Sequence, residues 1–194
     1  MFWAIIDLVQ YGRKIAMKEK QLKRVIKYEN AFLQVVEDDV LLPNNKATKR
    51  VVVKHIGAAC VLPITKKHTV ILTRQYRYAI EAESLEIPAG KKDTVNEDGL
   101  QCAKRELEEE TGYTSSDFSK LTEIYTAIGF SDELVEIFVA KDCVVMASPP
   151  AQDADEFIET VEIPLDEAIR MVDDGEIRDA KTVVALLYIG KNKV

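Results

Sequence analysis

The residues best suited to chemistry lie in one short run, RELEEETGY at 105–113. Glu106, Glu109 and Glu110 follow the spacing i, i+3 and i+4, so a helix would place all three carboxylates on one face. Like charges at that spacing repel and cost a helix roughly a few tenths of a kcal/mol per pair. Hard divalent cations such as Mg²⁺ take oxygen ligands beside substrate phosphates and would offset the repulsion. The run predicts either a cation site or, as many charge runs are, a solvated acidic helix face.

The neighbours of these acids favour the cation site. Arg105 can pair with Glu109 four residues later, which would order the cluster. Gly112 is a typical C-terminal stop for a helix, so the helix is expected at 99–110. Apolar residues at helical spacing mark a second face that can pack into a core, namely Leu100, Ala103 and Leu107.

The stretch from Gly90 to Tyr113 resembles the Nudix box, the signature of Nudix hydrolases. The signature is written G-x5-E-x7-R-E-U-x-E-E-x-G-U, where U is aliphatic or aromatic. Seven residues follow Glu97 before RELEEETGY, and this half matches at every fixed position. Six residues, not five, separate Gly90 from Glu97 in the loop KKDTVN. Loops tolerate such an insertion at small cost, so the helix stays intact and the placement of Glu97 depends on how the loop closes.

Shorter motifs resemble the ADP-ribose pyrophosphatases of that family, and the likeness covers roughly residues 22–190. They are RQYRY at 74–78, SLEIPAG at 84–90, GFSDE at 129–133, DEFIETVEIPLDEAI at 155–169 and GEIRDAKTVVALL at 175–187. The resemblance implies divalent-metal-dependent hydrolysis of a nucleoside diphosphate sugar, with ADP-ribose giving AMP and ribose 5-phosphate as the first candidate. The alternatives are another sugar nucleotide such as GDP-mannose, or a non-catalytic sensor that binds ADP-ribose. The intact glutamates speak against the sensor.

The resemblance assigns metal binding to Glu106, Glu109 and Glu110, together with the backbone carbonyl of Ala89. Mg²⁺ is the expected ion, with Mn²⁺ as an alternative. Attack on a diphosphate requires the phosphate charge to be neutralised and a water molecule to be activated, and a bound divalent cation serves both needs. Removal of Glu110 is therefore expected to slow turnover by orders of magnitude.

A general base must reach the attacking water, and the resemblance places it after the box, at Glu133. Asp132 and Glu136 are neighbouring acids that the sequence alone does not separate from Glu133. Arg105 is expected to orient the glutamates. The predicted catalytic set is therefore Glu133, Glu109 and Arg105.

Substrate binding should involve arginine, whose planar fork suits phosphate oxygens. Arg77 matches a family position that contacts the substrate, and Arg50 is a second candidate. Glu86 completes the predicted substrate-binding set. The alternatives are an ion pair between Arg77 and Glu86 and a simple surface charge at Arg50. Tyr28 or Phe32 could stack on a base across a dimer interface, although packing is the commoner role of such residues.

Composition narrows the protein class. A chain of 194 residues fits one domain with a substantial core, and its net charge of −7 argues against a nucleic-acid binder. No segment approaches the ~20 apolar residues of a membrane span, so no membrane partner is expected. The three cysteines are odd in number and lack CxxC spacing, which predicts reduced packing residues in a cytoplasmic protein. His55 and His68 are expected to be ordinary surface or strand residues.

The order of elements predicts an α/β protein, and the resemblance implies a Nudix-type α/β/α sandwich with a mixed sheet. Strands are expected at 21–37, 49–54, 57–64, 69–75, 85–87, 121–126, 135–142 and 157–163, with further helices at 165–173 and 179–189. Residues 1–20 would form a helical extension, packed on the protein or lying on a membrane surface. Residues 21–56 would form a small N-terminal β region that builds a homodimer, and 57–194 the Nudix domain.

Overall fold

The computed structural model describes residues 17–150 and 157–192 of the chain. The helix expected at 1–20 falls almost entirely on residues outside this part, and the first strand already begins at Lys20. The polar loop expected at 148–155 also lies largely outside it. Within the described residues, no helix is long and apolar enough to cross a membrane.

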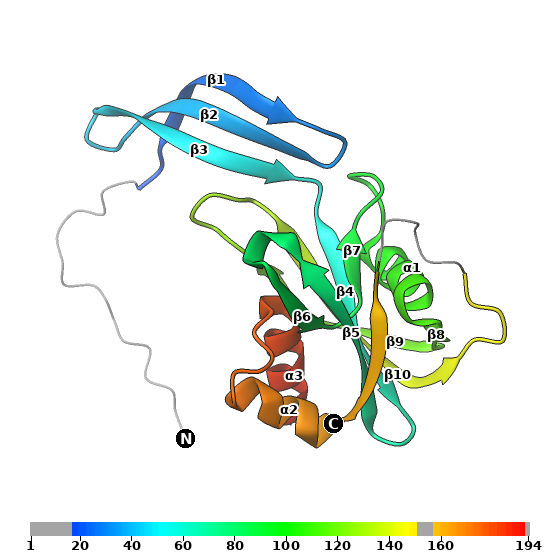
Figure 1. The fold of residues 1–194 in the computed structure, drawn as a ribbon. Coiled ribbons are helices and arrows are strands. Elements are labelled where there is room, and N and C mark those ends of the chain that lie inside the picture. The colour runs from blue at the N-terminus through cyan, green and yellow to red at the C-terminus, as the bar shows by residue number, and fades with distance from the viewer. Residues whose placement is uncertain (1–16, 151–156, 193–194) are drawn as a thin grey trace.

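The main body is built on one mixed sheet of eight strands (Figure 1). These are β4 (Ala58–Thr65), β5 (Thr69–Arg77), β6 (Ala82–Glu86), β7 (Ala89–Lys91), β8 (Tyr113–Thr114), β9 (Asp117–Tyr125), β10 (Leu134–Val145) and β11 (Glu159–Pro164). Its main path runs β11-β5-β4-β10-β8, while β6, β7 and β9 pair with β5, β4 and β10. The pair β4–β10 is parallel and the others are antiparallel. The short strand β7 was not predicted, and β9 begins four residues before the expected position.

Three helices cover the two faces of this sheet, namely α1 (Gly99–Thr111), α2 (Leu165–Asp173) and α3 (Ala180–Asn192). Alternate residues of β4 point to opposite faces, as in any strand. Ala59 and Val61 pack with the core residues of α1, whereas Cys60 and Leu62 pack with those of α2 and α3. Figure 1 shows α1 on one side of the sheet and α2 and α3 on the other. This is the expected α/β/α sandwich.

The start and end of α1 follow from its sequence. The side chain of Asp98 accepts hydrogen bonds from the backbone N–H groups of Leu100 and Gln101, which caps the helix start. Gly112 takes a left-handed conformation with φ of 68° and ends the helix, as predicted. On the inner face, Ala103 and Leu107 are fully buried. The helix that carries the acidic run is therefore fixed at both ends and along one side.

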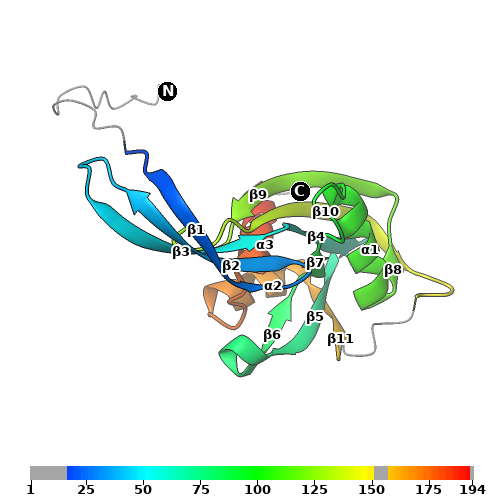
Figure 2. The same ribbon diagram turned by 90° about the horizontal axis from the view of Figure 1, so that it is seen from above.

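A second, three-stranded antiparallel sheet precedes the body and projects from it (Figure 2). It consists of β1 (Lys20–Glu29), β2 (Leu33–Leu41) and β3 (Ala47–His55). The single strand expected at 21–37 is wrong, because the chain reverses after Glu29. Asn30 drives the reversal, since its side-chain oxygen accepts the N–H groups of Phe32 and Leu33. The second turn, at 43–45, lies where it was predicted.

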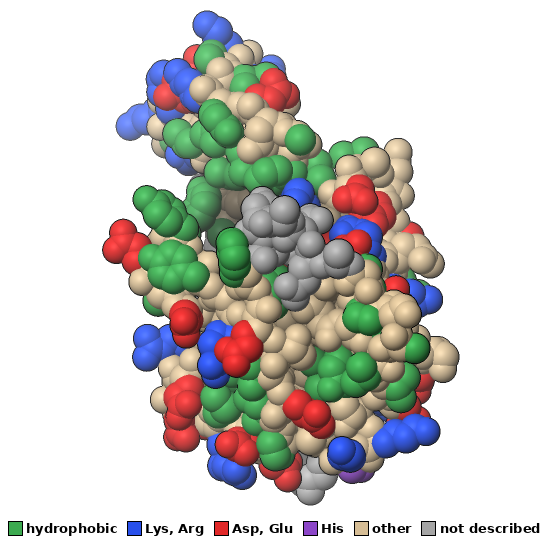
Figure 3. All heavy atoms as spheres, turned by 45° about the vertical axis from the view of Figure 1, so that its right-hand side comes forward, with side chains coloured by type: hydrophobic (Ala, Val, Ile, Leu, Met, Phe, Trp, Pro, Cys, Tyr) green, Lys and Arg blue, Asp and Glu red, His purple; other side chains and the backbone are tan. Residues whose placement is uncertain are grey.

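All ten residues of β1 are exposed, including several large apolar ones. These are Leu22, Val25, Ile26 and Tyr28. Figure 3 shows hydrophobic side chains along the projecting sheet, with Lys and Arg side chains around its far end. This sheet therefore leaves apolar surface uncovered in a single chain.

Candidate active site

A cavity of about 490 Å³ opens where β3, β7, α1 and α3 approach one another. Its lining includes four of the predicted site residues, Arg77, Ala89, Glu110 and Glu133. Other polar or aromatic groups of the lining are Phe32, His55, Gln75, Lys91, Thr126, Asp179 and Lys181. These residues come from segments far apart in the sequence, so the fold itself assembles the site.

The acidic face of α1 lies against the backbone of β7. Glu106 and Glu110 are only 8 % and 4 % exposed. The N–H of Ala89 donates to Oε2 of Glu110 at 3.0 Å. A Cβ atom on Gly90 would lie 2.0 Å from Oε1 of Glu106, so the carboxylate occupies space that only a glycine leaves open. The fold thus brings the predicted ligands Glu106, Glu110 and Ala89 together.

Arg105 makes the contacts that the sequence predicted. Its Nη1 donates to Oε1 of Glu106 at 2.5 Å and to Oε2 of Glu109 at 3.2 Å. Its Nη2 donates to the carbonyl of Lys91 at 3.2 Å. Its Nε is buried and has no hydrogen-bond partner within the described residues. The guanidinium therefore links two carboxylates of α1 to the strand beside them.

The structure separates the three acids that the sequence could not. Glu133 lines the cavity, with its side chain 30 % exposed, and accepts a hydrogen bond from Oγ1 of Thr126 at 2.5 Å. Asp132 turns instead toward β3, where it pairs with Lys54 and accepts the N–H of His55. Glu136 does not line the cavity and pairs instead with Lys92 and Lys120.

His55 reaches the cavity, although no pattern in the sequence predicts it there. It ends β3, as expected of a strand residue, but its side chain lines the cavity. Its Nδ1 accepts the N–H of Gly57 at 3.1 Å and lies 3.6 Å from Oε1 of Glu133. Nδ1 of His55 therefore faces both a backbone N–H group and the carboxylate of Glu133. The ring also meets Phe32 edge to face, at 5.9 Å between centroids.

Arg77 forms the ion pair that the sequence left open. Its Nε and Nη2 bind the two carboxylate oxygens of Glu86 at 2.7 and 2.6 Å. Lys181, from α3, binds the same carboxylate at 2.5 Å. Burial raises the pKa of Glu86, but Arg77 and Lys181 outweigh it and lower that pKa to about 2. Glu86 is therefore a buried anion that holds two cations at the cavity wall.

The family described as NUDIX domain matches residues 53–186 of the chain. The chain belongs to the Nudix family. It is a hydrolase, and the region from Gly90 to Tyr113 is its Nudix box.

The most similar relatives carry several names. An ADP-ribose pyrophosphatase of Bacillus subtilis (strain 168) is 40 % identical over 174 residues, covering 90 % of this chain and 94 % of that protein. A methanol dehydrogenase activator of Bacillus methanolicus is 38 % identical over 172 residues, covering 89 % and 92 %. A GDP-mannose pyrophosphatase of Escherichia coli (strain K12) is 38 % identical over 140 residues, covering 69 % and 72 %.

A solved structure supports the fold. The crystal structure of an ADP compounds hydrolase superposes with a TM-score of 0.74 and 24 % identity, covering 90 % of this chain and 93 % of that one. The predicted architecture, a mixed sheet between helices with a small antiparallel sheet beside it, is confirmed.

Nudix hydrolases generally use divalent metal ions, and the oxygen donors on α1 suit such ions in kind. The fit rests on two buried carboxylates, Glu106 and Glu110, packed against the backbone at 89–90. In the part of the chain that the structure describes, no three His, Cys, Asp or Glu side chains form a ready-made metal site. Two of the candidate ligands, Glu106 and Glu109, form ion pairs with Arg105.

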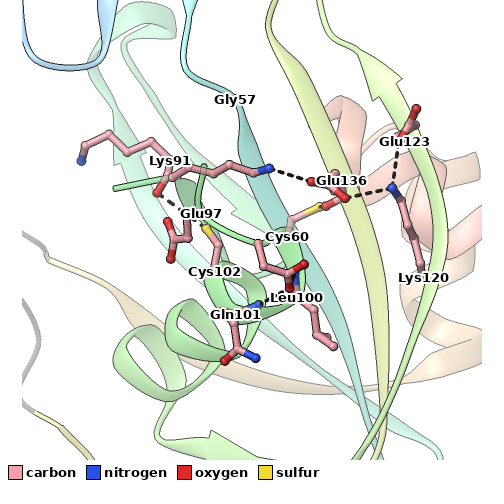
Figure 4. Close-up of polar contacts among 12 residues, drawn as sticks. Gly57, Cys60, Lys91, Glu97, Leu100, Gln101, Cys102, Lys120, Glu123 and Glu136 are labelled. Carbon is pink, nitrogen blue, oxygen red and sulfur yellow. Dashed lines mark hydrogen bonds and ion pairs between the residues drawn. The ribbon is translucent and has the colours of Figure 1, made fainter. Parts of the chain in front are cut away.

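Glu97, which follows the loop with the extra residue, lies beside Arg105 of the Nudix box. Its Oε1 lies 3.6 Å from Nη2 of Arg105, and its Oε2 accepts the N–H of Asp93 at 2.6 Å. The loop is anchored by Lys92, whose Nζ binds Glu136 at 2.8 Å. The same carboxylate also binds Nζ of Lys120 at 2.8 Å (Figure 4). The insertion is therefore absorbed before Glu97, which still reaches the arginine of the box.

Arg50 is not brought to the cavity of its own chain. It is exposed on β3 and pairs with Glu19 at 2.7 Å. Sequence reasoning did not place His55 or Lys181 at the site, although both line the cavity. The sequence could have indicated Lys181 only through the segment GEIRDAKTVVALL, which resembles the family. No feature of that segment distinguishes Lys181 from its neighbours.

Proposed function

We propose that this Nudix hydrolase cleaves the diphosphate linkage of a nucleoside diphosphate sugar with Mg²⁺, and that ADP-ribose is its substrate, giving AMP and ribose 5-phosphate. The proposal rests on one observation: Glu110, Ala89, Glu133 and Arg77 all line the same cavity. It joins oxygen ligands for a cation, a carboxylate base and a phosphate-binding arginine. The ADP-ribose pyrophosphatase at 40 % identity supports the choice of substrate.

The carboxylates of Glu106, Glu109 and Glu110 and the carbonyl of Ala89 would hold the ion, with Mn²⁺ as a substitute. The ion, when bound, neutralises phosphate charge and lowers the pKa of a coordinated water. The chain positions these oxygens through Arg105, which fixes two of the carboxylates. Glu110 in turn is fixed by the N–H of Ala89.

Glu133 would act as the general base. It lies in the cavity and is partly exposed, so its carboxylate can take a proton from a water molecule. The water oxygen then bonds to one phosphorus while the bond from that phosphorus to the bridging oxygen breaks. The released phosphate carries the electron pair of the bridging bond away as the second product. The reaction consumes one water molecule and needs no other reactant.

Substrate binding would involve Arg77, with Glu86 in the same wall and Arg50 from a second subunit. A homodimer is supported by the apolar residues exposed on β1. A cytoplasmic location is supported by the three cysteines, which are buried and free among the described residues.

The test is an incubation of the purified protein with Mg²⁺ and a panel of sugar nucleotides, followed by chromatography of the products. We expect AMP and ribose 5-phosphate from ADP-ribose at the highest kcat/KM. GDP-mannose is the second candidate because the GDP-mannose pyrophosphatase of E. coli (strain K12) is also similar. A higher kcat/KM for GDP-mannose would select that substrate, and binding of ADP-ribose without any product would identify a sensor.

A further inference from the structure

Lys181 has an unusual environment for a lysine. It lies in the first turn of α3, its side chain is only 13 % exposed, and it lines the same cavity as Glu110 and Glu133. Its Nζ binds Glu86 at 2.5 Å and Asp179 at 3.0 Å. Lysines are seldom buried unless they are paired with an opposite charge, and here two carboxylates supply that pairing beside the cavity.

Among the described residues, the ammonium group of Lys181 uses fewer hydrogen-bond donors than it has. It carries three N–H bonds, and among the described residues two of them are used, on Glu86 and Asp179. Arg77 is in the same situation, because Glu86 takes its Nε and Nη2 and leaves Nη1. Two cations at one cavity wall thus each have a donor left for a ligand.

The two carboxylates that bind Lys181 also bind other groups. Asp179 accepts the N–H and the Oγ1–H of Thr182, at 3.1 and 2.6 Å, which fixes the start of α3. Glu86 is shared with Arg77. Burial lowers the pKa of Lys181, but Asp179 and Glu86 outweigh it and raise that pKa, so the side chain stays cationic.

We propose that Lys181 and Arg77, both anchored on Glu86, form a two-cation cradle for one phosphate of the substrate. Lys181 is then a substrate-binding residue. Glu86 is a positioning residue that sets the spacing of the two cations and does not itself contact the substrate. The inference rests on the proposed function and adds to it a cavity residue from α3.

The cradle explains why the cations are held so firmly. Lysine and arginine side chains lose considerable rotamer freedom when they bind a ligand, and a site that is already ordered avoids this cost. The shared carboxylate orders both side chains before the substrate arrives. It also brings the two positive charges together, which a free pair of cations would resist.

The experiment compares Lys181→Met with the wild type by calorimetric binding of AMP, ribose 5-phosphate and adenosine. We expect the variant to weaken either AMP or ribose 5-phosphate about tenfold, as for a lost charged hydrogen bond, and to leave adenosine unchanged. The affected product identifies the phosphate in the cradle. With ADP-ribose and Mg²⁺, KM should rise about tenfold with a smaller change in kcat, and Lys181→Arg should restore most of the loss.

The control is Lys191→Met, which removes an exposed lysine from the last turn of the same helix and should change nothing. Thermal unfolding checks that each variant is folded, and Lys181→Gln replaces Lys181→Met if the latter does not fold. Equal losses for AMP, ribose 5-phosphate and adenosine would mean a purely structural lysine. No loss for any of them, or no binding of either phosphate by the wild type, would also overturn the cradle. Failure of the wild type to hydrolyse any sugar nucleotide would refute the proposed function alone, because the cradle is judged on binding.

Discussion

The two sheets of this enzyme are built from strands of opposite character. In β4 seven of the eight residues are buried, because helices cover both faces of the larger sheet. In β1 all ten residues are exposed, although the strand contains four large apolar side chains. The body therefore completes its own hydrophobic core. The N-terminal sheet keeps apolar surface that a second chain could bury.

The two regions meet at the loop that carries Glu133. The N–H of Val53 on β3 donates to the carbonyl of Phe130 at 2.7 Å, and the N–H of Asp132 donates back to Val53 at 3.2 Å. Lys54 and Asp132 add an ion pair. The placement of the proposed base thus depends on the N-terminal sheet, whereas the carboxylates on α1 depend on the body alone.

Glu110→Gln should have the largest effect, and the effect should be confined to the body. Loss of one charged ligand removes much of the affinity for the ion, so kcat/KM with Mg²⁺ should fall about 10³-fold or more. The amide can still accept the N–H of Ala89 through its oxygen, so the melting temperature should stay close to that of the wild type. Steady-state kinetics and thermal unfolding check both expectations. Near-normal turnover would remove Glu110 from the metal site.

The body could be predicted from the sequence because its signals are local. The stop at Gly112 and the spacing of the glutamates both belong to one helix. The pairing of Arg105 with Glu109 needed only that helix. The turn at Asn30 was missed because a side-chain oxygen makes it and neither Gly nor Pro marks it.

The rest of the site could not be predicted because it depends on contacts between distant segments. Lys181 binds Glu86, which lies 95 residues earlier in the chain. His55 reaches the cavity only because β3 passes the loop of Glu133. Neither residue belongs to a pattern that marks its role, and folding alone places them beside the acidic helix.

Glu133→Gln tests the point where the two regions meet. Loss of a general base should lower kcat by about 10²-fold or more and remove the acidic limb of the pH–rate profile. Folding and association should be unaffected, because the glutamine can keep the hydrogen bond to Thr126. The matched control is Glu136→Gln, since Glu136 lies outside the cavity and pairs with Lys92 and Lys120. An unchanged profile for Glu133→Gln would show that another group takes the proton.

Glu86→Gln should lower the free energy of unfolding of the body, by an amount that depends on pH. The pKa of Glu86 is lowered from 4.5 to about 2 in the folded state, which corresponds to about 3 kcal/mol of stability. Because the folded pKa is the lower one, this contribution is present above pH 4.5 and is lost as the pH falls toward 2. Urea unfolding of both proteins should therefore show the wild type more stable at pH 7 and nearly equal to the variant near pH 2. A constant difference at every pH would contradict the ion-pair interpretation.

Ile26→Asp should have the smallest effect on the stability of the body, because it changes only the N-terminal sheet. Ile26 is 50 % exposed in the single chain, and a carboxylate there would be desolvated in a dimer interface. Light scattering should show a dimer for the wild type and a monomer for the variant. Gln21→Asp adds the same charge at an already polar position of β1 and should remain dimeric. If the wild type is a monomer at micromolar concentration, the apolar surface of β1 has some other use. If Ile26→Asp dissociates the dimer and also lowers kcat, the second chain contributes to the site, as expected if Arg50 acts across the interface.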